Sequence, residues 1–213
     1  MPRTKNPKPQ YSVSPGVKML QNWIATLEDK TGRTLDEWLD LARSKGPKEV
    51  KALRDWLKSK HGLGTNAAWW IAERSLGLPG SEGEDTPEAY LKTAVVYVDD
   101  QYAGKKKGLR PIYDRLLELG LEIGDESKAC PCKTMVPFYR NHVFANITPS
   151  TNSRVDLGLA LAKVPEGKIP KRLIDTGGKA KKDRITHRIP IESVDLIDAF
   201  VEKWLKAAYD LDA

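Results

Sequence analysis

Hydrophobic residues in the first third of the chain recur at the period of an amphipathic helix. Apolar side chains spaced by three or four positions predict a first helix through Val17, Leu20, Trp23, Ile24 and Leu27. The same spacing predicts three further helices, over 35–45, 47–61 and 65–77. These segments share five tryptophans, and together they predict a small helical domain.

Residues that cap helices set the predicted ends of these segments. Thr34 followed by Glu37 matches the capping-box pattern at the start of the second helix. Gly46 and Gly62 are typical of helix stops, and Pro47 suits the first turn of the third helix. The helix boundaries are therefore predicted from local chemistry.

The pattern changes after residue 77. Residues 77–87 concentrate glycine, proline and acids without periodicity, which marks a domain boundary. Two more helical patterns follow, over 87–104 and 108–124, and a last one covers 193–211 with Ser193 as its cap. Between them lie short segments rich in β-branched and aromatic residues, which we predict as strands over 133–140, 143–149, 154–161 and 184–191.

This order of elements predicts the α+β class. We expect a small N-terminal helical domain, followed by an α+β domain with a mainly antiparallel sheet packed against helices. The expected divisions are a disordered basic tail over 1–14, the helical domain over 15–77, a linker over 78–86 and the α+β domain over 87–213.

The charge of the chain favours acidic partners. Its 213 residues carry a formal net charge of +6, which favours nucleic acid or phosphorylated ligands but does not bear on the fold. The N-terminal segment has no apolar stretch typical of a secretory signal, and no segment approaches the roughly 18 apolar residues of a membrane helix. We therefore expect a cytoplasmic protein with no membrane partner.

Several long motifs resemble an uncharacterised bacterial two-domain family. The N-terminal helical domain of that family is similar to TGRTLDEWLDLARSKG and WLKSKHGLGTNAA. Its C-terminal domain is similar to YAGKKKGLRPIYDRLLELG, KTMVPFYRNHVFANITPSTNSRVDLGLAL and THRIPIESVDLIDAFVEKWLKAAYD. The resemblance implies no established activity. We set aside a transport label carried by relatives of the second domain, because we expect no membrane segment. The C-terminal pattern also distantly resembles double-wing, DNA-binding-like domains, and this favours nucleic acid slightly.

The segment around Gly62 and Gly64 is the first candidate site. A helix, a glycine–apolar–glycine turn and a second helix can present backbone N–H groups and a helix dipole to a phosphate. Lys60 and Asn66 would add a charge and a side-chain donor. The alternative is a tight corner, in which Gly62 ends one helix and Leu63 fills the core. Both interpretations stay open.

A basic segment over 168–188 is the second candidate site. Its eight cations face only two acids, Asp175 and Asp183, so its excess equals the net charge of the whole chain. The cations that would contact a polyanion are Lys168, Lys171, Arg172, Lys179, Lys181, Lys182, Arg184 and Arg188. The glycine pair before KAKK could form a backbone nest for a phosphate. The alternative is an ordinary solvated loop.

The predicted sheet offers a third candidate, a polar face. Strand alternation places Arg154 and Asp156 opposite an apolar row, and it turns Thr186 and Arg188 outward while His187 joins the apolar side. A small ligand pocket would then be lined by Arg154, Asp156, Arg188, Tyr139 and Lys133.

Cys130 and Cys132 raise the question of a metal or redox site. With His187 they would form an incomplete zinc set, and His142 lies about ten residues away, near a hairpin turn. Ordinary edge-strand thiols explain the pair more simply, so we predict neither a metal nor another cofactor.

No nucleophile motif or helical pair of metal-binding carboxylates occurs, which disfavours an enzyme. The sequence therefore predicts a non-enzymatic protein that binds DNA or RNA, or another polyanion, with weak sequence preference. The alternatives are a small-molecule or anion-binding domain, with or without catalytic activity, that uses the polar sheet face, and a module that binds another protein.

Overall fold

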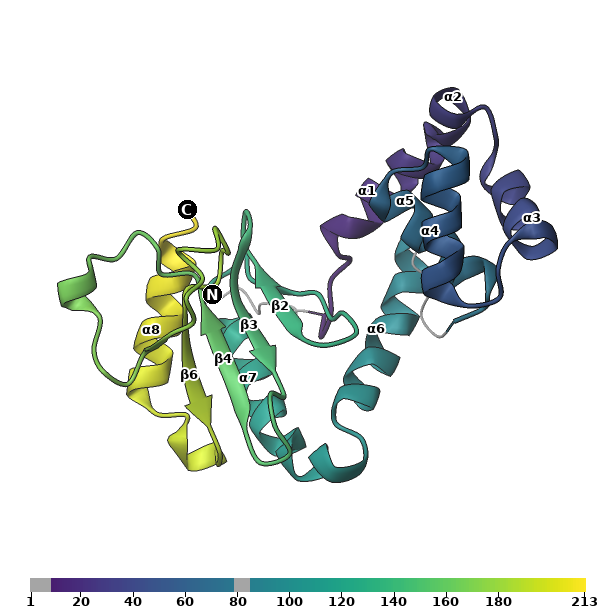
Figure 1. The fold of residues 1–213 in the computed structure, drawn as a ribbon. Coiled ribbons are helices and arrows are strands. Elements are labelled where there is room, and N and C mark those ends of the chain that lie inside the picture. Colours follow the sequence, from purple (N-terminus) through teal and green to yellow (C-terminus); the bar gives the residue numbers. More distant parts are fainter. Residues whose placement is uncertain (1–8, 79–84) are drawn as a thin grey trace, which may run out of the picture. The chain divides into compact units, whose positions relative to one another are not determined.

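A computed structural model describes residues 9–78 and 85–213 (Figure 1). The chain divides into two compact units. The helical unit spans Val13–Thr93, and the C-terminal unit combines Ala94–Ala213 with the described residues up to Ser12. The division falls inside one continuous helix, α6 (Pro87–Gln101), rather than at the expected boundary before residue 87. Most of the expected linker, residues 79–84, lies outside the described residues.

The helical unit contains five helices before α6: α1 (Pro15–Ala25), α2 (Leu27–Thr31), α3 (Leu35–Lys45), α4 (Val50–His61) and α5 (Thr65–Ser75). The predicted first helix is interrupted at Thr26, whose hydroxyl donates to the carbonyls of Asn22 and Trp23. The capping box of α3 is confirmed, because Thr34 and Glu37 exchange side-chain and backbone bonds. Helix α4 begins at Val50 rather than Pro47, since the Glu49 carboxylate accepts its first N–H groups.

Leucines from α2 to α4 and small or branched residues of α5 form the core of the helical unit. Trp38 is buried, and its indole N–H donates to the Thr31 hydroxyl at 2.8 Å. Trp69 is exposed instead, with the Arg54 guanidinium 5.2 Å from its ring centroid. Tryptophan side chains therefore lie both in the core and on the surface of this unit.

The C-terminal unit is built on a six-stranded antiparallel sheet with strand order β1-β2-β3-β4-β6-β5. The strands are β1 (Lys128–Ala129), β2 (Val136–Tyr139), β3 (Val143–Thr148), β4 (Val155–Leu159), β5 (Ile174–Asp175) and β6 (His187–Ile191). Helices α7 (Arg110–Glu122) and α8 (Ala199–Asp210) pack against it (Figure 1). The predicted α+β class is confirmed.

Short 3₁₀ helices complete this unit: η1 (Gly104–Leu109), η2 (Glu166–Lys168) and η3 (Val194–Leu196). Helix α8 starts later than predicted, because Asp198 rather than Ser193 caps it by accepting the Phe200 and Val201 N–H groups.

The strand register separates an apolar from a mixed face of the sheet. Phe138, Ala145 and Leu159 are cross-strand neighbours, and the Phe138 ring lies against Gly120 of α7. The opposite face carries a row across four strands, formed by Pro137, Asn146, Gly158 and Arg188. The predicted polar face therefore exists, on the side away from α7.

The N-terminal segment differs from the expected solvated tail over 1–14. Tyr11 is 8% exposed, and its hydroxyl lies 2.9 Å from the Tyr113 hydroxyl. The Ser12 N–H donates to the Ala129 carbonyl at 2.8 Å, and Ser14 caps α1. Residues 1–8 lie outside the described part. The expectation fails at Tyr11 because a single aromatic side chain can anchor an otherwise polar segment.

Candidate phosphate-binding pocket and charged surfaces

The turn between α4 and α5 has the backbone geometry that both sequence interpretations require. Gly62 adopts the left-handed conformation, with φ of 69°, and its N–H donates to the Lys58 carbonyl. Leu63 is buried in the helical core. Gly64 precedes α5 in extended conformation, and no side chain of the described residues caps this helix. The first N–H groups of α5 are therefore not engaged by a protein cap.

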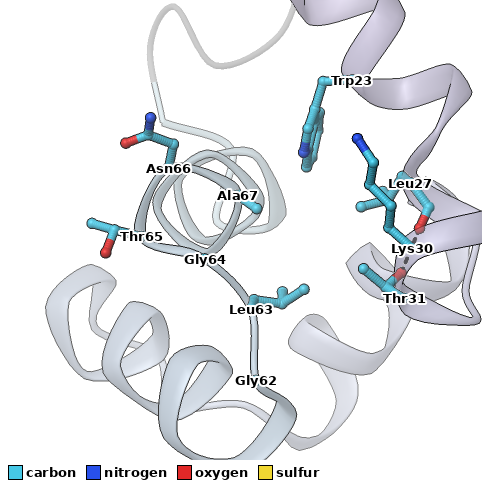
Figure 2. Close-up of a pocket in the computed structure, with 10 residues that line it drawn as sticks. All are labelled: Trp23, Leu27, Lys30, Thr31, Gly62, Leu63, Gly64, Thr65, Asn66 and Ala67. Carbon is cyan, nitrogen blue, oxygen red and sulfur yellow. Dashed lines mark hydrogen bonds between the residues drawn. The ribbon is translucent and has the colours of Figure 1, made fainter.

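A pocket of about 500 Å³ opens beside this uncapped helix start (Figure 2). Leu63 and Ala67 point into it, whereas the Thr65 and Asn66 side chains point away from Trp23 and Lys30. Its full lining is Trp23, Leu27, Lys30, Thr31, Gly62, Leu63, Gly64, Thr65, Asn66 and Ala67. The pocket is thus made by α1 and α2 on one side and by the α4–α5 turn on the other.

The opposite wall of the pocket carries an aromatic ring and a cation. The Trp23 ring is held by an edge contact with Trp70, with centroids 5.0 Å apart, and the Arg74 guanidinium covers Trp70. Lys30 lines the pocket, and its ammonium has no carboxylate partner within 9–78 or 85–213. A helix N-terminus carries a partial positive charge. The electrostatics of the pocket therefore favour an anion.

Lys60 is the one residue predicted for this candidate that lies outside the pocket lining, and the neighbouring His61 also does. Lys60 is exposed in the last turn of α4, two residues before Gly62. His61 faces the core, because its ring contacts Trp38 and Trp56 at centroid distances of 5.7 and 4.4 Å. Lys60 can contribute only longer-range attraction.

The basic segment over 168–188 is largely neutralised by carboxylates from other parts of the chain. Arg172 pairs with Asp198 at 2.6 Å, and Lys179 pairs with Glu166 at 3.2 Å. Arg184 pairs with Asp212, and Arg188 pairs with Asp156, each at 2.5 Å. Among its cations, Lys168, Lys171, Lys181 and Lys182 make no ion pair with the described residues. Four of the eight cations named from the sequence are thus ion-paired with carboxylates outside the segment, which a count within the segment does not include.

The glycine pair in this segment does not form a phosphate nest. The Gly177 N–H donates to the Asp175 carboxylate at 2.7 Å, and the Gly178 N–H donates to the Thr176 hydroxyl at 3.2 Å. The Asp183 N–H donates to the Gly178 carbonyl. The loop satisfies these donors internally, so they are unavailable to an anion.

The structure does not assemble the predicted ligand pocket around Asp156. The Asp156 carboxylate is held between Arg188 at 2.5 Å and Arg154 at 2.9 Å. Asp156 pairs with Thr148 at one end of β3, whereas Tyr139 pairs with Val143 at the other end. The intervening residues of β3 separate these ends by roughly 16 Å. Tyr139 therefore cannot share a small pocket with this ion cluster, and Lys133 lies exposed in the turn before β2.

Thr186 points inward, which corrects the predicted orientation. Thr186 is 1% exposed, and its hydroxyl accepts the Leu161 N–H at 3.2 Å and lies 2.9 Å from Nδ1 of His187. The strand begins only at His187, so the alternation assumed from Arg184 onward does not hold. His187 is half-buried and acts as a hydrogen-bonding neighbour of Thr186.

Neither Cys130 nor Cys132 forms a disulfide. Burial raises the pKa of Cys130 to about 12, so this thiol stays protonated at neutral pH. The Cys132 thiol donates to the Met135 carbonyl at 3.3 Å. His142 lies elsewhere, beside Asp212. Within 9–78 and 85–213, no group of three or more histidine, cysteine or carboxylate side chains is placed to hold a metal ion.

Three features of the C-terminal unit were not predicted. Asn146 lies in the middle of β3, opposite Gly158. The Asp212 carboxylate accepts hydrogen bonds from His142 and Arg184, which lie in two other segments. Lys105–Lys107 form a basic turn in η1. The run of lysines was visible in the sequence. The other two depend on strand register and on long-range contacts.

Comparisons with known families account for most of the chain. Residues 19–74 match a domain of unknown function, DUF4287, and residues 98–212 match a second domain of unknown function, DUF5655. This confirms the resemblance to an uncharacterised two-domain family. No curated protein and no solved structure matches the chain. In the described part of the chain, every helix is too short or too polar to cross a bilayer. Because the match over residues 98–212 covers more than half of the 213 residues, the protein belongs to the DUF5655 family.

Proposed function

We propose that this protein binds the phosphate backbone of nucleic acid, with weak sequence preference, at the pocket beside α5. The observation that carries the proposal is the uncapped start of α5, which opens into a pocket whose other wall presents Lys30 and Trp23. We place this binding in the cytoplasm, as the sequence leads us to expect.

The pocket combines the three contacts that a nucleotide backbone uses. Backbone N–H groups at the start of α5 and the Lys30 ammonium would receive a phosphate oxygen. Trp23 would offer an apolar face to the sugar or to an unpaired base. None of these contacts reads a base edge, which is why weak sequence preference is proposed.

Other exposed lysines would add long-range attraction. Lys58 and Lys60 lie in the last turn of α4, just before Gly62, which lines the pocket. The basic segment over 168–188 would contribute less to the attraction of nucleic acid than its sequence predicts, because carboxylates neutralise its three arginines.

A titration at two salt concentrations tests the proposal. Labelled single-stranded DNA, duplex DNA and single-stranded RNA would be titrated with the full chain in 50 and 200 mM NaCl. If Lys30, Lys58 and Lys60 neutralise about three phosphates, the affinity should fall between these concentrations by about fortyfold for duplex DNA and by about twentyfold for the single strands. No binding of any of these nucleic acids at 50 mM NaCl would refute the function.

A matched pair of variants at Gly64 tests the location. Gly64 has a φ of −62°, and a Cβ atom added there would meet open space, so Gly64→Asp and Gly64→Asn should both fold and both cap α5. The aspartate puts a negative charge where the phosphate would lie, and it should weaken binding by about tenfold or more. The asparagine variant would engage one of the same N–H groups without adding a charge, so it should weaken binding less than the aspartate does, by about threefold. Equal affinities of the two variants would show that nucleic acid binds elsewhere.

A further inference from the structure

We infer that the C-terminal unit binds a small organic carboxylate in a second pocket, on the sheet face opposite α7. The pocket has a volume of about 360 Å³, comparable to about a dozen water molecules. It lies between β2 and β3 and the loop that joins β5 to β6. The lining is Met135, Pro137, Val143, Asn146, Thr176, Gly178, Lys181, Asp183, Arg184 and Ile185.

An asparagine with spare hydrogen-bonding capacity forms part of the floor. Asn146 lies within β3, and its side-chain N–H donates only to the thioether of Met135, at 3.3 Å. A thioether is a weak acceptor, and the amide oxygen accepts no hydrogen bond from the described residues. A half-buried amide in a sheet is usually better satisfied. Asn146 can therefore accept a hydrogen bond from a ligand.

Two glycines allow protein groups to pack closely beside the pocket. A Cβ atom at Gly158 would lie 2.2 Å from the Asn146 amide oxygen, and one at Gly178 would lie 2.2 Å from the Ile185 carbonyl oxygen. The loop that forms the wall is braced, because Thr176 bonds to Thr186 through its backbone and to Ile185 through its hydroxyl. The wall of the pocket is therefore held by hydrogen bonds within the protein, which suits a small-molecule site.

The charges at the pocket suit one carboxylate. Arg184 donates to the Val143 carbonyl and to Asp212, and its remaining terminal nitrogen has no partner among the described residues. Lys181 is exposed and makes no ion pair there. Asp183 also lines the pocket, but one of its oxygens accepts the Ile185 N–H of its own loop. The lining itself holds two cations, Lys181 and Arg184, against one carboxylate, Asp183, and this excess of one positive charge suits a monoanionic carboxylate better than a dianionic phosphate.

The expected ligand follows from these contacts. Its carboxylate would lie near Lys181 and Arg184, and its apolar body would contact Pro137, Val143 and Ile185. A hydroxyl or amino group would donate to Asn146. This site belongs to the C-terminal unit, so the inference does not depend on nucleic-acid binding by the helical unit.

A titration with 4-hydroxyphenylacetate tests the inference, because this probe carries a carboxylate, a ring and a donor. Nuclear magnetic resonance of the ¹⁵N-labelled full chain would follow the side-chain amide of Asn146. We expect a saturable shift with a Kd of about 1 mM or below. The uncharged 4-hydroxyphenylacetamide should bind at least about fivefold more weakly, as should phenylacetate, which lacks the donor.

Variants and a phosphate probe complete the test. Lys181→Met should weaken the binding of 4-hydroxyphenylacetate about fivefold, whereas Lys171→Met, an exposed lysine outside the lining, should leave it unchanged. The inference is wrong if the Asn146 signal shows no saturable shift up to about 10 mM. It is also wrong if the acetamide binds as well as the acid, if Lys181→Met has no effect, or if phenyl phosphate binds more tightly than the carboxylates.

Discussion

Asp212 shows how one carboxylate can join three parts of a sheet domain. It is 6% exposed, and it accepts the His142 backbone N–H at 2.7 Å and the Arg184 guanidinium at 2.5 Å. Burial acts to raise the pKa of this carboxyl, but the bonds from His142 and Arg184 outweigh it and hold the pKa below its ordinary value. Asp212 is therefore charged at neutral pH and stabilises the folded state in that form.

Replacing Asp212 should destabilise the protein in a pH-dependent way. At pH 7, Asp212→Asn should cost about 2 kcal/mol of unfolding free energy, because Arg184 and the His142 N–H lose a charged partner. A carboxyl whose folded pKa is lowered contributes stability above its unfolded pKa of about 3.9, and the contribution disappears as the pH falls through the folded pKa. Urea unfolding at pH 7 and pH 3 should therefore show a smaller difference at pH 3.

Asp210 provides the control for this comparison. It is exposed at the end of α8 and pairs with Lys206 four residues earlier. Asp210→Asn should change the unfolding free energy by about 0.5 kcal/mol or less at pH 7. If Asp212→Asn behaves like Asp210→Asn, the carboxylate does not hold these segments together.

At the scale of elements, the close approach of α7 to the sheet depends on one glycine. A Cβ atom at Gly120 would lie 2.2 Å from the Phe138 ring, which is fully buried in β2. The Gly120 carbonyl also accepts the buried Ser127 hydroxyl. Helix and strand are therefore in contact at a position where no larger residue fits.

Gly120→Ala should destabilise the C-terminal unit despite the higher helix propensity of alanine. The clash with Phe138 should cost about 2 kcal/mol, against a propensity gain of about 1 kcal/mol or less. Gly108→Ala is the matched control, because nothing lies within 4 Å of the corresponding Cβ position. Thermal unfolding should show a lower Tm for Gly120→Ala and little change for Gly108→Ala. A Tm for Gly120→Ala at or above that of the parent would contradict this view of the packing.

Local sequence signals predicted where helices begin and end better than they predicted which residues contact one another. The capping box at Thr34 and the stop at Gly62 depend on neighbouring residues, and both are found as predicted. The inward turn of Thr186 was missed, because the strand begins at His187, three residues later than predicted, and the Thr186 hydroxyl accepts the Leu161 N–H. Alternation within a segment cannot show where the segment starts to pair.

At the scale of the whole molecule, sequence-distant partners decide which charges are free. Arg188 meets Asp156 across a strand pair, and Arg172 meets the cap of α8. The acids lie 32 and 26 positions away from these arginines, so counting charges within one segment overstated its excess. The phosphate pocket was found more directly, because Gly62 and Gly64 are close in sequence, but its Trp23 and Lys30 wall depends on helix packing.

The C-terminal unit is itself assembled from two distant pieces of chain. Tyr11 lies in its core beside Tyr113, although the helical unit separates the two in sequence.

Tyr11→Ala should cost about 3 kcal/mol of unfolding free energy, and Tyr11→Phe about 1 kcal/mol, because the Tyr113 hydroxyl loses its partner. Urea unfolding of the full chain would measure both. Gln10→Ala, at an exposed position, should stay within about 0.5 kcal/mol of the parent. An unchanged unfolding midpoint for Tyr11→Ala would show that the segment is not docked.

The docking of Tyr11 and Ser12 has a consequence for biosynthesis. Their partners Tyr113 and Ala129 leave the ribosome more than a hundred residues later, which corresponds to roughly ten seconds of translation. The helices of the intervening unit rely on nearby contacts and can fold during that interval. The aromatic anchor must therefore stay unburied while a neighbouring domain matures. Its late capture places completion of the second domain's core after synthesis of the helical unit.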